Sequence, residues 1–152
     1  MCGRFVIFSE EENEEIRKIV HEINSRLNPE EATRFKTGEI RPTDHVPIIA
    51  AAGNKKVIGL AKFGFPNYKN NGIIINARSE TLKEKPTFRN ILASKRCIIP
   101  ASGYYEWKLA GDKKEKYLIR TDKPLLYMAG LYNNFIDKDN NPYIGFVIIT
   151  TE

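Results

Sequence analysis

The chain has 152 residues and a formal net charge of +5 at pH 7, a length that suits one domain. Two cysteines are too few for a secreted disulfide framework, and no apolar run approaches membrane-spanning length. A secretory signal is also excluded, because the N-terminus lacks a basic region followed by an apolar stretch. We therefore expect one domain over residues 1–152, without a membrane partner, in the cytoplasm or nucleoid.

The charge is unevenly distributed along the chain. Residues 1–31 carry eight acidic and four basic side chains, a net −4, so the remainder carries a net +9. This asymmetry allows a surface that binds a polyanion such as a nucleic acid. Charge alone favours the simpler interpretation, a solvated surface on a lysine-rich protein.

The chain opens with Met1-Cys2-Gly3-Arg4-Phe5. A terminal cysteine is a poor packing residue, because chain ends fray. Removal of Met1 would leave an amine and a thiol on adjacent carbons of Cys2, a 1,2-aminothiol that can attack one electrophile twice. The residues up to this point leave open why a reactive thiol stands there.

An amphipathic helix is predicted next. Ser9 and Glu12 have the spacing of a capping box, and apolar residues then recur at helical intervals up to Asn28-Pro29. These residues are Ile16, Ile19, Val20, Ile23 and Leu27. The acid-rich first turns complement the helix dipole.

Short apolar runs separated by turn signals predict a meandering antiparallel sheet or barrel. The expected strands are 46–51, 57–65, 73–76, 96–99, 104–108, 116–120, 125–131 and 143–150, with one or two helical turns between 79 and 94. The fold class is therefore α+β, mainly antiparallel β and barrel-like, with the N-terminal helix and short helices. The last strand runs almost to Glu152, which indicates either an edge strand or a chain cut short.

Two internal stretches combine polar groups with strands. In "IIINARSET", Asn76 follows a buried strand and on its own would be a turn former. In "RCIIPASGYYEWK", the strand is expected to break at Pro100, and alternation places Glu106 on the face opposite Tyr105 and Trp107. Glu106 is either a solvated surface carboxylate or a proton carrier in a partly desolvated cleft, and the residues leave both open.

Other candidate residues are set aside. Cys97 lies in an apolar strand and is interpreted as a small buried hydrophobe. Ser102 lacks the spacing of a nucleophile elbow. His21 and His45 have no metal-ligand partners at useful spacing and are interpreted as surface residues, so neither a metal nor another cofactor is expected.

Four stretches in order, "MCGRF", "INARSET", "KPTFRNILASKRCIIPASGYYEW" and "GFVIITT", resemble the SOS response-associated peptidase family, also called abasic-site processing proteins. The resemblance covers nearly the whole chain. It implies a mainly β fold with a DNA-binding channel, self-peptidase and lyase activities, and a stable covalent thiazolidine with abasic sites in single-stranded DNA. It also implies that Cys2 becomes the N-terminal residue after Met1 is removed, either by the protein itself or by an aminopeptidase. It implies no cofactor, and we expect a monomer.

The same resemblance assigns roles to residues. Cys2 is the nucleophile, Asn76 orients the N-terminal group or the sugar, and Glu106 transfers protons. DNA-binding residues would be Arg78, Arg4, Phe63, Phe88, Arg89 and Thr150. The chemistry agrees, because an α-amine with a reference pKa of about 7.7 is partly neutral in cells and can form an imine, on which the thiol closes a ring.

Two departures from the family pattern bear on this hypothesis. Phe63-Gly64 stands where the family has tryptophan-glycine, which predicts weakened stacking on DNA. No counterpart exists for the family's catalytic histidine in a His-x-Arg-Met-Pro motif, so the chain is either truncated at its C-terminus or lacks that residue. The alternative function is a non-covalent single-strand-binding module; a peptidase acting on other proteins finds no support in these residues.

Overall fold

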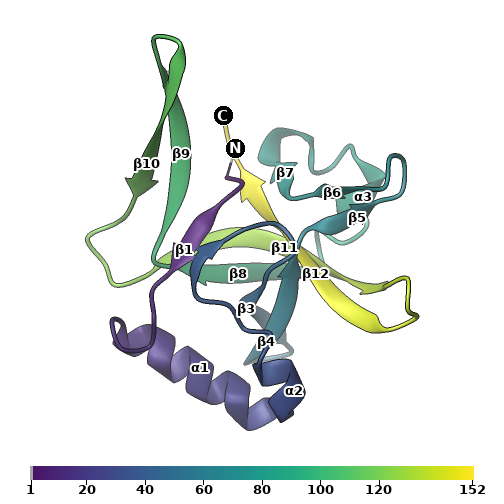
Figure 1. The fold of residues 1–152 in the computed structure, drawn as a ribbon. Coiled ribbons are helices and arrows are strands. Elements are labelled where there is room, and N and C mark those ends of the chain that lie inside the picture. Colours follow the sequence, from purple (N-terminus) through teal and green to yellow (C-terminus); the bar gives the residue numbers. More distant parts are fainter. Residues whose placement is uncertain (1) are drawn as a thin grey trace.

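The computed structural model describes residues 2–152. Its centre is a ring of five strands, seen edge-on in Figure 1. The strands are β3 (His45–Ala52), β4 (Lys55–Phe63), β8 (Arg96–Ala101), β11 (Leu126–Ile136) and β12 (Pro142–Thr150). The ring runs β11-β8-β3-β4-β12 and closes because β12 also pairs with β11. The predicted barrel-like, mainly antiparallel fold is confirmed.

The ring encloses apolar side chains from alternate strand positions. Phe63 of β4 and Phe146 of β12 occupy partner positions in these parallel strands, and their rings stack with centroids 5.1 Å apart. Phe5 contacts Phe63 edge-on at 5.5 Å. The three phenylalanine side chains are fully buried, so they form the centre of the hydrophobic core inside the five strands.

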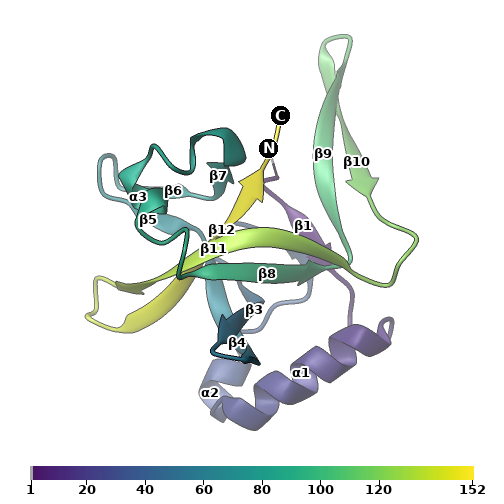
Figure 2. The ribbon, with the colours of Figure 1, turned by 180° about the vertical axis from the view of Figure 1, so that it is seen from behind.

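A second sheet joins the N-terminal strand to a long hairpin. Its order is β10-β9-β1-β2. The elements are β1 (Phe5–Ile7), β2 (Gly38–Ile40), β9 (Gly103–Ala110) and β10 (Lys113–Ile119). Both views show the β9–β10 hairpin extending away from the body (Figures 1 and 2), and every residue of β10 is exposed.

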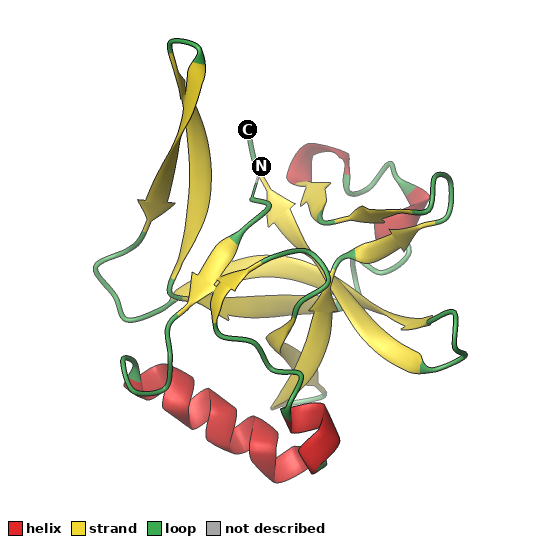
Figure 3. Ribbon diagram, viewed as in Figure 1, coloured by secondary structure: helices red, strands yellow, loops and turns green. Residues whose placement is uncertain are grey.

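The helices α1 (Glu14–Arg26) and α2 (Pro29–Ala32) lie together at one end of the molecule (Figure 3). The predicted apolar face is confirmed, because Ile16, Ile19, Val20 and Ile23 of α1 are buried. The predicted capping box was wrong. Asn13 caps α1, since its side chain accepts hydrogen bonds from the main-chain N–H groups of residues 15 and 16.

A small layer of short strands and helical turns packs along β12, next to the five-stranded ring. It contains β5 (Phe65–Asn67), β6 (Gly72–Ile74), β7 (Asn76–Arg78), a 3-10 turn (Ser79–Thr81) and α3 (Pro86–Arg89). Gly64 allows the chain to leave β4 for this layer: its φ is +119°, and a Cβ there would collide with Ile73. Strand β7 pairs in parallel with β12.

The remaining differences from the sequence predictions concern short or interior strands. Strands β1 and β2 were missed, and the expected strands 57–65 and 73–76 reached only the first residue of β5 and of β7. Pro100 does not end its strand, because β8 continues to Ala101. Strand β12 is not an edge strand, since β4, β7 and β11 all pair with it. His45 is half-buried rather than a free surface residue, and burial lowers its pKa. Within residues 2–152, no helix combines the length and apolarity required to cross a bilayer.

Candidate functional site

Cys2 lies just before β1 and is almost fully buried, with 7% of its surface exposed. Its Sγ donates to the main-chain oxygen of Arg4 over 3.7 Å. Burial raises the pKa of the Cys2 thiol to about 11, and the nearby Glu106 carboxylate adds to the rise. The thiol is therefore protonated at neutral pH.

Asn76 connects Cys2 to the end of β12. It is the first residue of β7 and lies in register with Ile148. Its Nδ2 donates to the main-chain oxygen of Cys2 over 3.0 Å and lies 3.5 Å from that of Ile148. Its Oδ1 is buried without a hydrogen-bond partner among the residues that the structure describes. The amide that bonds to the Cys2 carbonyl therefore also carries a buried acceptor oxygen.

Glu106 lies on β9 and shares a pocket of about 280 Å³ with Cys2 and Tyr104. The opposite wall comes from β11 and from β12 with the residue that follows it: Leu126, Tyr127, Met128, Ala129, Ile148, Ile149, Thr150 and Thr151. Glu106 is half-buried there. The structure therefore places this carboxylate in a cleft beside the thiol.

Arg78 and Thr150 occupy partner positions on β7 and β12. They line a neighbouring pocket of about 250 Å³ with Glu80, Thr151 and Glu152. Thr150 and Thr151 line the Cys2 pocket as well. The end of β12 therefore brings the Arg78 side of the molecule next to the Cys2 pocket.

Arg4 shares with Asn76 a third pocket, separate from the two pockets at the end of β12. It lines an open pocket of about 570 Å³ with Gly3, Pro42, Ile75, Asn76 and Trp107. The Arg4 guanidinium lies 5.4 Å from the centre of the Trp107 ring, within cation–π range. Trp107 and Pro42 were not predicted as site residues. Strand alternation carried no signal for Trp107, since it places this ring on the face of β9 opposite Glu106.

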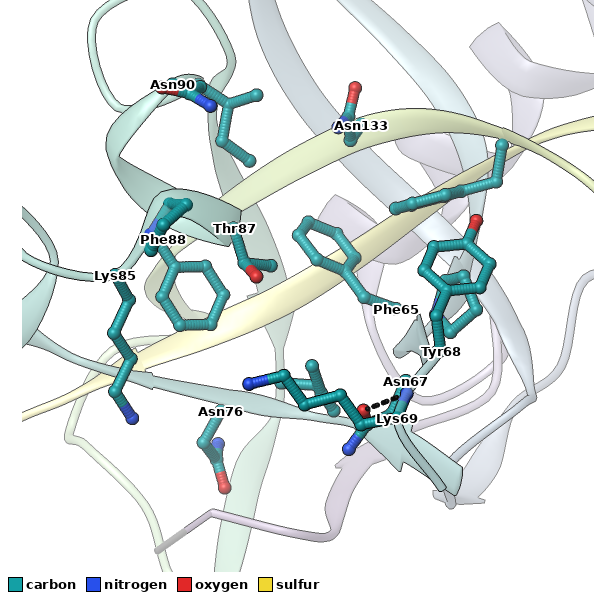
Figure 4. Close-up of a pocket in the computed structure, with 15 residues that line it drawn as sticks. Phe65, Asn67, Tyr68, Lys69, Asn76, Lys85, Thr87, Phe88, Asn90 and Asn133 are labelled. Carbon is teal, nitrogen blue, oxygen red and sulfur yellow. Dashed lines mark hydrogen bonds between the residues drawn. The ribbon is translucent and has the colours of Figure 1, made fainter. Parts of the chain in front are cut away.

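A larger pocket of about 730 Å³ reaches from Asn76 into the small layer. Its wall includes Phe65 and Phe88, whose ring centroids are 6.3 Å apart. Figure 4 shows Lys69, Lys85 and Asn76 along one side of this pocket. Phe65 and Phe88 are almost fully buried, so the two lysines, rather than these two rings, are the groups along this pocket that can contact a nucleic-acid strand, through its phosphates.

Three of the residues predicted to bind DNA lie away from any exposed binding surface or from the pockets described above. Phe63 has no exposed surface and packs in the barrel core, so it cannot stack on DNA. Phe88 is buried, although its ring contributes to the pocket wall. Arg89 is exposed at the end of α3 and lines none of the pockets described above. Tyr68, which is 81% exposed and lines the large pocket, offers the accessible aromatic ring.

The other sulfur and the buried hydroxyl have packing roles. Cys97 is buried in β8, and burial raises the pKa of its thiol to about 12. Ser102 is buried and accepts a hydrogen bond from the Phe8 main-chain N–H over 2.9 Å. Within the described residues 2–152, no three His, Cys, Asp or Glu side chains are grouped as metal ligands.

Known proteins resemble this chain over its full length. The family model "SOS response associated peptidase (SRAP)" matches residues 1–152. The abasic site processing protein YoqW of Bacillus subtilis is 37% identical over 160 residues, which cover 100% of this chain and 69% of YoqW. The abasic site processing protein YedK of Escherichia coli is 27% identical over 99% of this chain and 67% of its own length.

The fold has a counterpart among solved structures as well. A crystal structure of a protein from Bacteroides thetaiotaomicron matches 99% of this chain and 68% of its own length, with a TM-score of 0.78 and 26% identity. The family model, the similarity to YoqW and the structural match each extend over nearly the whole chain. This chain belongs to the SOS response associated peptidase (SRAP) family.

Proposed function

We propose that this protein is an abasic-site processing enzyme that binds single-stranded DNA and attaches Cys2 covalently to the lesion after Met1 is removed. The observation that carries the proposal is the cluster around Cys2: Asn76 bonds to its carbonyl, and Glu106 lines the pocket that the thiol enters. The names of the relatives YoqW and YedK support the substrate class. We further propose a monomer that acts in the bacterial cytoplasm or nucleoid.

The reaction joins two nucleophiles of one residue to one sugar carbon. The neutral α-amine of mature Cys2 adds to the aldehyde of the ring-opened sugar, and loss of water gives an imine. The sulfur then adds to the imine carbon while the nitrogen gains a proton. The net reaction converts aldehyde, amine and thiol to a thiazolidine and one water.

Glu106 serves as the proton carrier in this scheme. A thiol with a reference pKa of about 8.5 is mainly protonated at neutral pH, so ring closure requires a base for the S–H proton. A carboxylate in the same pocket can accept that proton and return it to the nitrogen. The same acid–base group can protonate the ring oxygen as the C1′–O4′ bond opens to the aldehyde and hydroxyl, and can assist the loss of water that gives the imine.

Asn76 serves to orient the amine. Its Nδ2 holds the Cys2 carbonyl, which fixes the backbone of the nucleophile. Its Oδ1 is a buried acceptor without a partner among the described residues, and an amine N–H of mature Cys2 would supply the missing donor. This contact directs the nitrogen lone pair to one face of the aldehyde.

Release of Met1 is assigned to the protein itself, as a self-peptidase that hydrolyses the Met1–Cys2 bond with water. A lyase step at the same sugar remains part of the proposal. Arg4 and Arg78 line pockets on two sides of the cluster around Cys2 and Asn76, which supports a role for each in holding phosphates on either side of the lesion, with Thr150 beside Arg78. The large pocket with Lys69 and Lys85 extends this path toward a neighbouring nucleotide.

The test is a denaturing gel of mature protein, with loss of Met1 verified by mass spectrometry, after incubation with a single strand that carries one abasic site. A shifted covalent species is expected for the wild type and for Cys97→Ala, the matched control for a second buried thiol. Cys2→Ala and Glu106→Gln should lose it. A shift that survives in Cys2→Ala contradicts the mechanism. Salt-sensitive binding without any covalent species assigns the protein instead to the non-covalent class.

A further inference from the structure

An ion network crosses the sheet beside the proposed site. Glu39 of β2 receives two cations on the same oxygen: Oε1 lies 3.2 Å from a terminal nitrogen of Arg4 and 3.1 Å from Nζ of Lys116. Lys116 comes from β10, so the network joins strands from opposite edges of the second sheet. Two positive charges thus share one carboxylate, which leaves the group with a net positive charge.

The two cations also lie over aromatic rings. Lys116 Nζ is 4.1 Å from the centre of the Tyr105 ring and 5.7 Å from that of Trp107. The Arg4 guanidinium lies over the Trp107 ring as well, 5.4 Å from its centre. The rings hold the cations in place independently of Glu39, so the carboxylate is not needed to position them.

The network is accessible to a competing anion. The side chains of Arg4, Lys116 and Glu39 are 40%, 39% and 26% exposed. Ion pairs with this exposure contribute little to folding, because water screens them. The local backbone has its own support, since β1 pairs with both β2 and β9.

The network adjoins the pocket in which a strand would lie. Arg4 and Trp107 line the pocket that contains Asn76, and Asn76 bonds to Cys2. A phosphate that reaches Arg4 therefore meets the Glu39 carboxylate, which repels it and already occupies the cations. Two donors converging on one oxygen is also the arrangement that a phosphate oxygen would accept.

We propose that Glu39 is an internal counterion that competes with DNA phosphates for Arg4 and Lys116, and so limits how tightly the protein holds strands without a lesion. This inference rests on the DNA binding proposed above and adds a specificity-determining residue to it. Strands with an abasic site are retained by the covalent bond to Cys2, whereas intact strands depend on the phosphate contacts that Glu39 weakens.

The test measures how binding depends on salt. Fluorescence anisotropy follows a labelled oligothymidine without lesions, over a series of sodium chloride concentrations, with wild type, Glu39→Gln and Glu22→Gln. Glu22 is the matched control, because it loses the same charge from an exposed ion pair with Arg26 on α1, at the far end of the molecule (Figure 1). Glu39→Gln should bind severalfold more tightly at low salt, with a slope of log K against log salt steeper by about 0.7 per added phosphate contact.

A double variant separates this role from a structural one. Glu39→Gln/Lys116→Gln restores the local charge, so its slope should return to the wild-type value. Glu22→Gln should keep the wild-type slope. The proposal is overturned if Glu39→Gln behaves like Glu22→Gln, if its affinity falls, or if the double variant keeps the steeper slope, which would indicate a loosened hairpin.

A competition assay supplies the second readout. Lesion-free competitor strand should suppress crosslinking of an abasic strand at severalfold lower concentration in Glu39→Gln than in wild type. If the wild type crosslinks through Cys2 but the variants show no difference, the counterion role alone fails. If the wild type neither binds the strand nor crosslinks, both this role and the proposed function fail.

Discussion

The side-chain amide of Asn76 bonds to the main-chain oxygen of Cys2 across 74 positions of sequence, over 3.0 Å. Asn76→Asp keeps the shape but removes the donor and places a charge against two carbonyl oxygens. We expect the crosslinking rate to fall by about tenfold or more, since a buried hydrogen bond lost in this way costs about 1–3 kcal/mol. Single-turnover gels measure the rate.

Asn134→Asp is the control for Asn76, because it makes the same change at an exposed position of β11. It should keep the wild-type rate. A normal rate in Asn76→Asp would remove Asn76 from the mechanism, whatever the effect on stability.

Glu106 and Cys2 are coupled through charge as well as through the pocket. The carboxylate contributes to the raised pKa of the thiol, because a nearby negative charge disfavours the thiolate. Glu106→Gln should therefore lower the pKa of the Cys2 thiol and speed its alkylation by iodoacetamide severalfold, although the same variant loses crosslinking. The alkylation rate is measured at a fixed pH between about 8 and 10, a range that brackets the reference pKa of a thiol. Peptide mass mapping identifies the alkylated cysteine.

Glu80→Gln is the matched control for this alkylation experiment, since Glu80 lies in the neighbouring pocket that lacks Cys2. Its alkylation rate should stay close to that of the wild type. Slower alkylation of Cys2 in Glu106→Gln would show that the carboxylate assists thiol ionisation instead of opposing it.

The two buried thiols predict a loss of stability in alkaline solution. Their pKa values rise from 9.0 to about 11 for Cys2 and about 12 for Cys97, chiefly by burial. Above pH 9 the unfolded chain releases these protons while the folded chain keeps them, so the free energy of unfolding falls as pH rises toward 11. Each thiol contributes a slope of about 1 kcal/mol per pH unit.

Urea denaturation at several pH values measures this slope. Cys97→Ala should flatten it by about half while Cys2 remains, and comparison of slopes removes the fixed cost of the smaller side chain. Equal slopes in the two proteins would contradict the prediction. Ionising lysines affect both proteins alike and cancel in the comparison.

The aromatic residues Phe63 and Tyr68 should separate stability from DNA binding. Phe63→Leu leaves a gap in the fully buried stack with Phe146 and should lower the free energy of unfolding by about 1–2 kcal/mol without changing DNA affinity. Tyr68→Leu removes an exposed ring beside the large pocket. It should weaken single-strand binding severalfold and leave the urea midpoint unchanged. If Phe63→Leu weakened DNA binding and Tyr68→Leu lowered only the stability, Phe63 rather than Tyr68 would be the DNA-binding residue.

Periodicity predicted the parts of the fold in which one face is buried. The helix was found because four of its apolar residues pack inward, and the eight expected strands all correspond to observed ones with shifted ends. Strands β1, β2, β5 and β7 have three residues each, too few to display alternation, so β1 and β2 were missed and only one end residue of β5 and of β7 lay in an expected strand. The helix start was misplaced because Ser9 and Asn13 both offer capping chemistry, and only tertiary contacts distinguish them.

The candidate site was predicted from chemistry, and its neighbours were not. The position of Cys2 and the polar residues at strand ends indicated Asn76 and Glu106, which the structure brings to the same thiol. The Phe63 assignment was wrong because the sequence motif does not report which side of β4 faces the core. Glu39, in an unrecognised strand, carried no signal at all until β2 was placed beside Arg4.

The distance in sequence between Cys2 and its neighbours also affects how the protein is made. Synthesis proceeds from the N-terminus, so the thiol leaves the ribosome long before Asn76, Glu106 and the final barrel strand exist. The bond to Asn76 and the pocket shared with Glu106 join segments far apart in the sequence, which slows their formation. The nascent chain therefore exposes the cysteine to oxidants, and folding buries it once β12 has paired with β4 and β7.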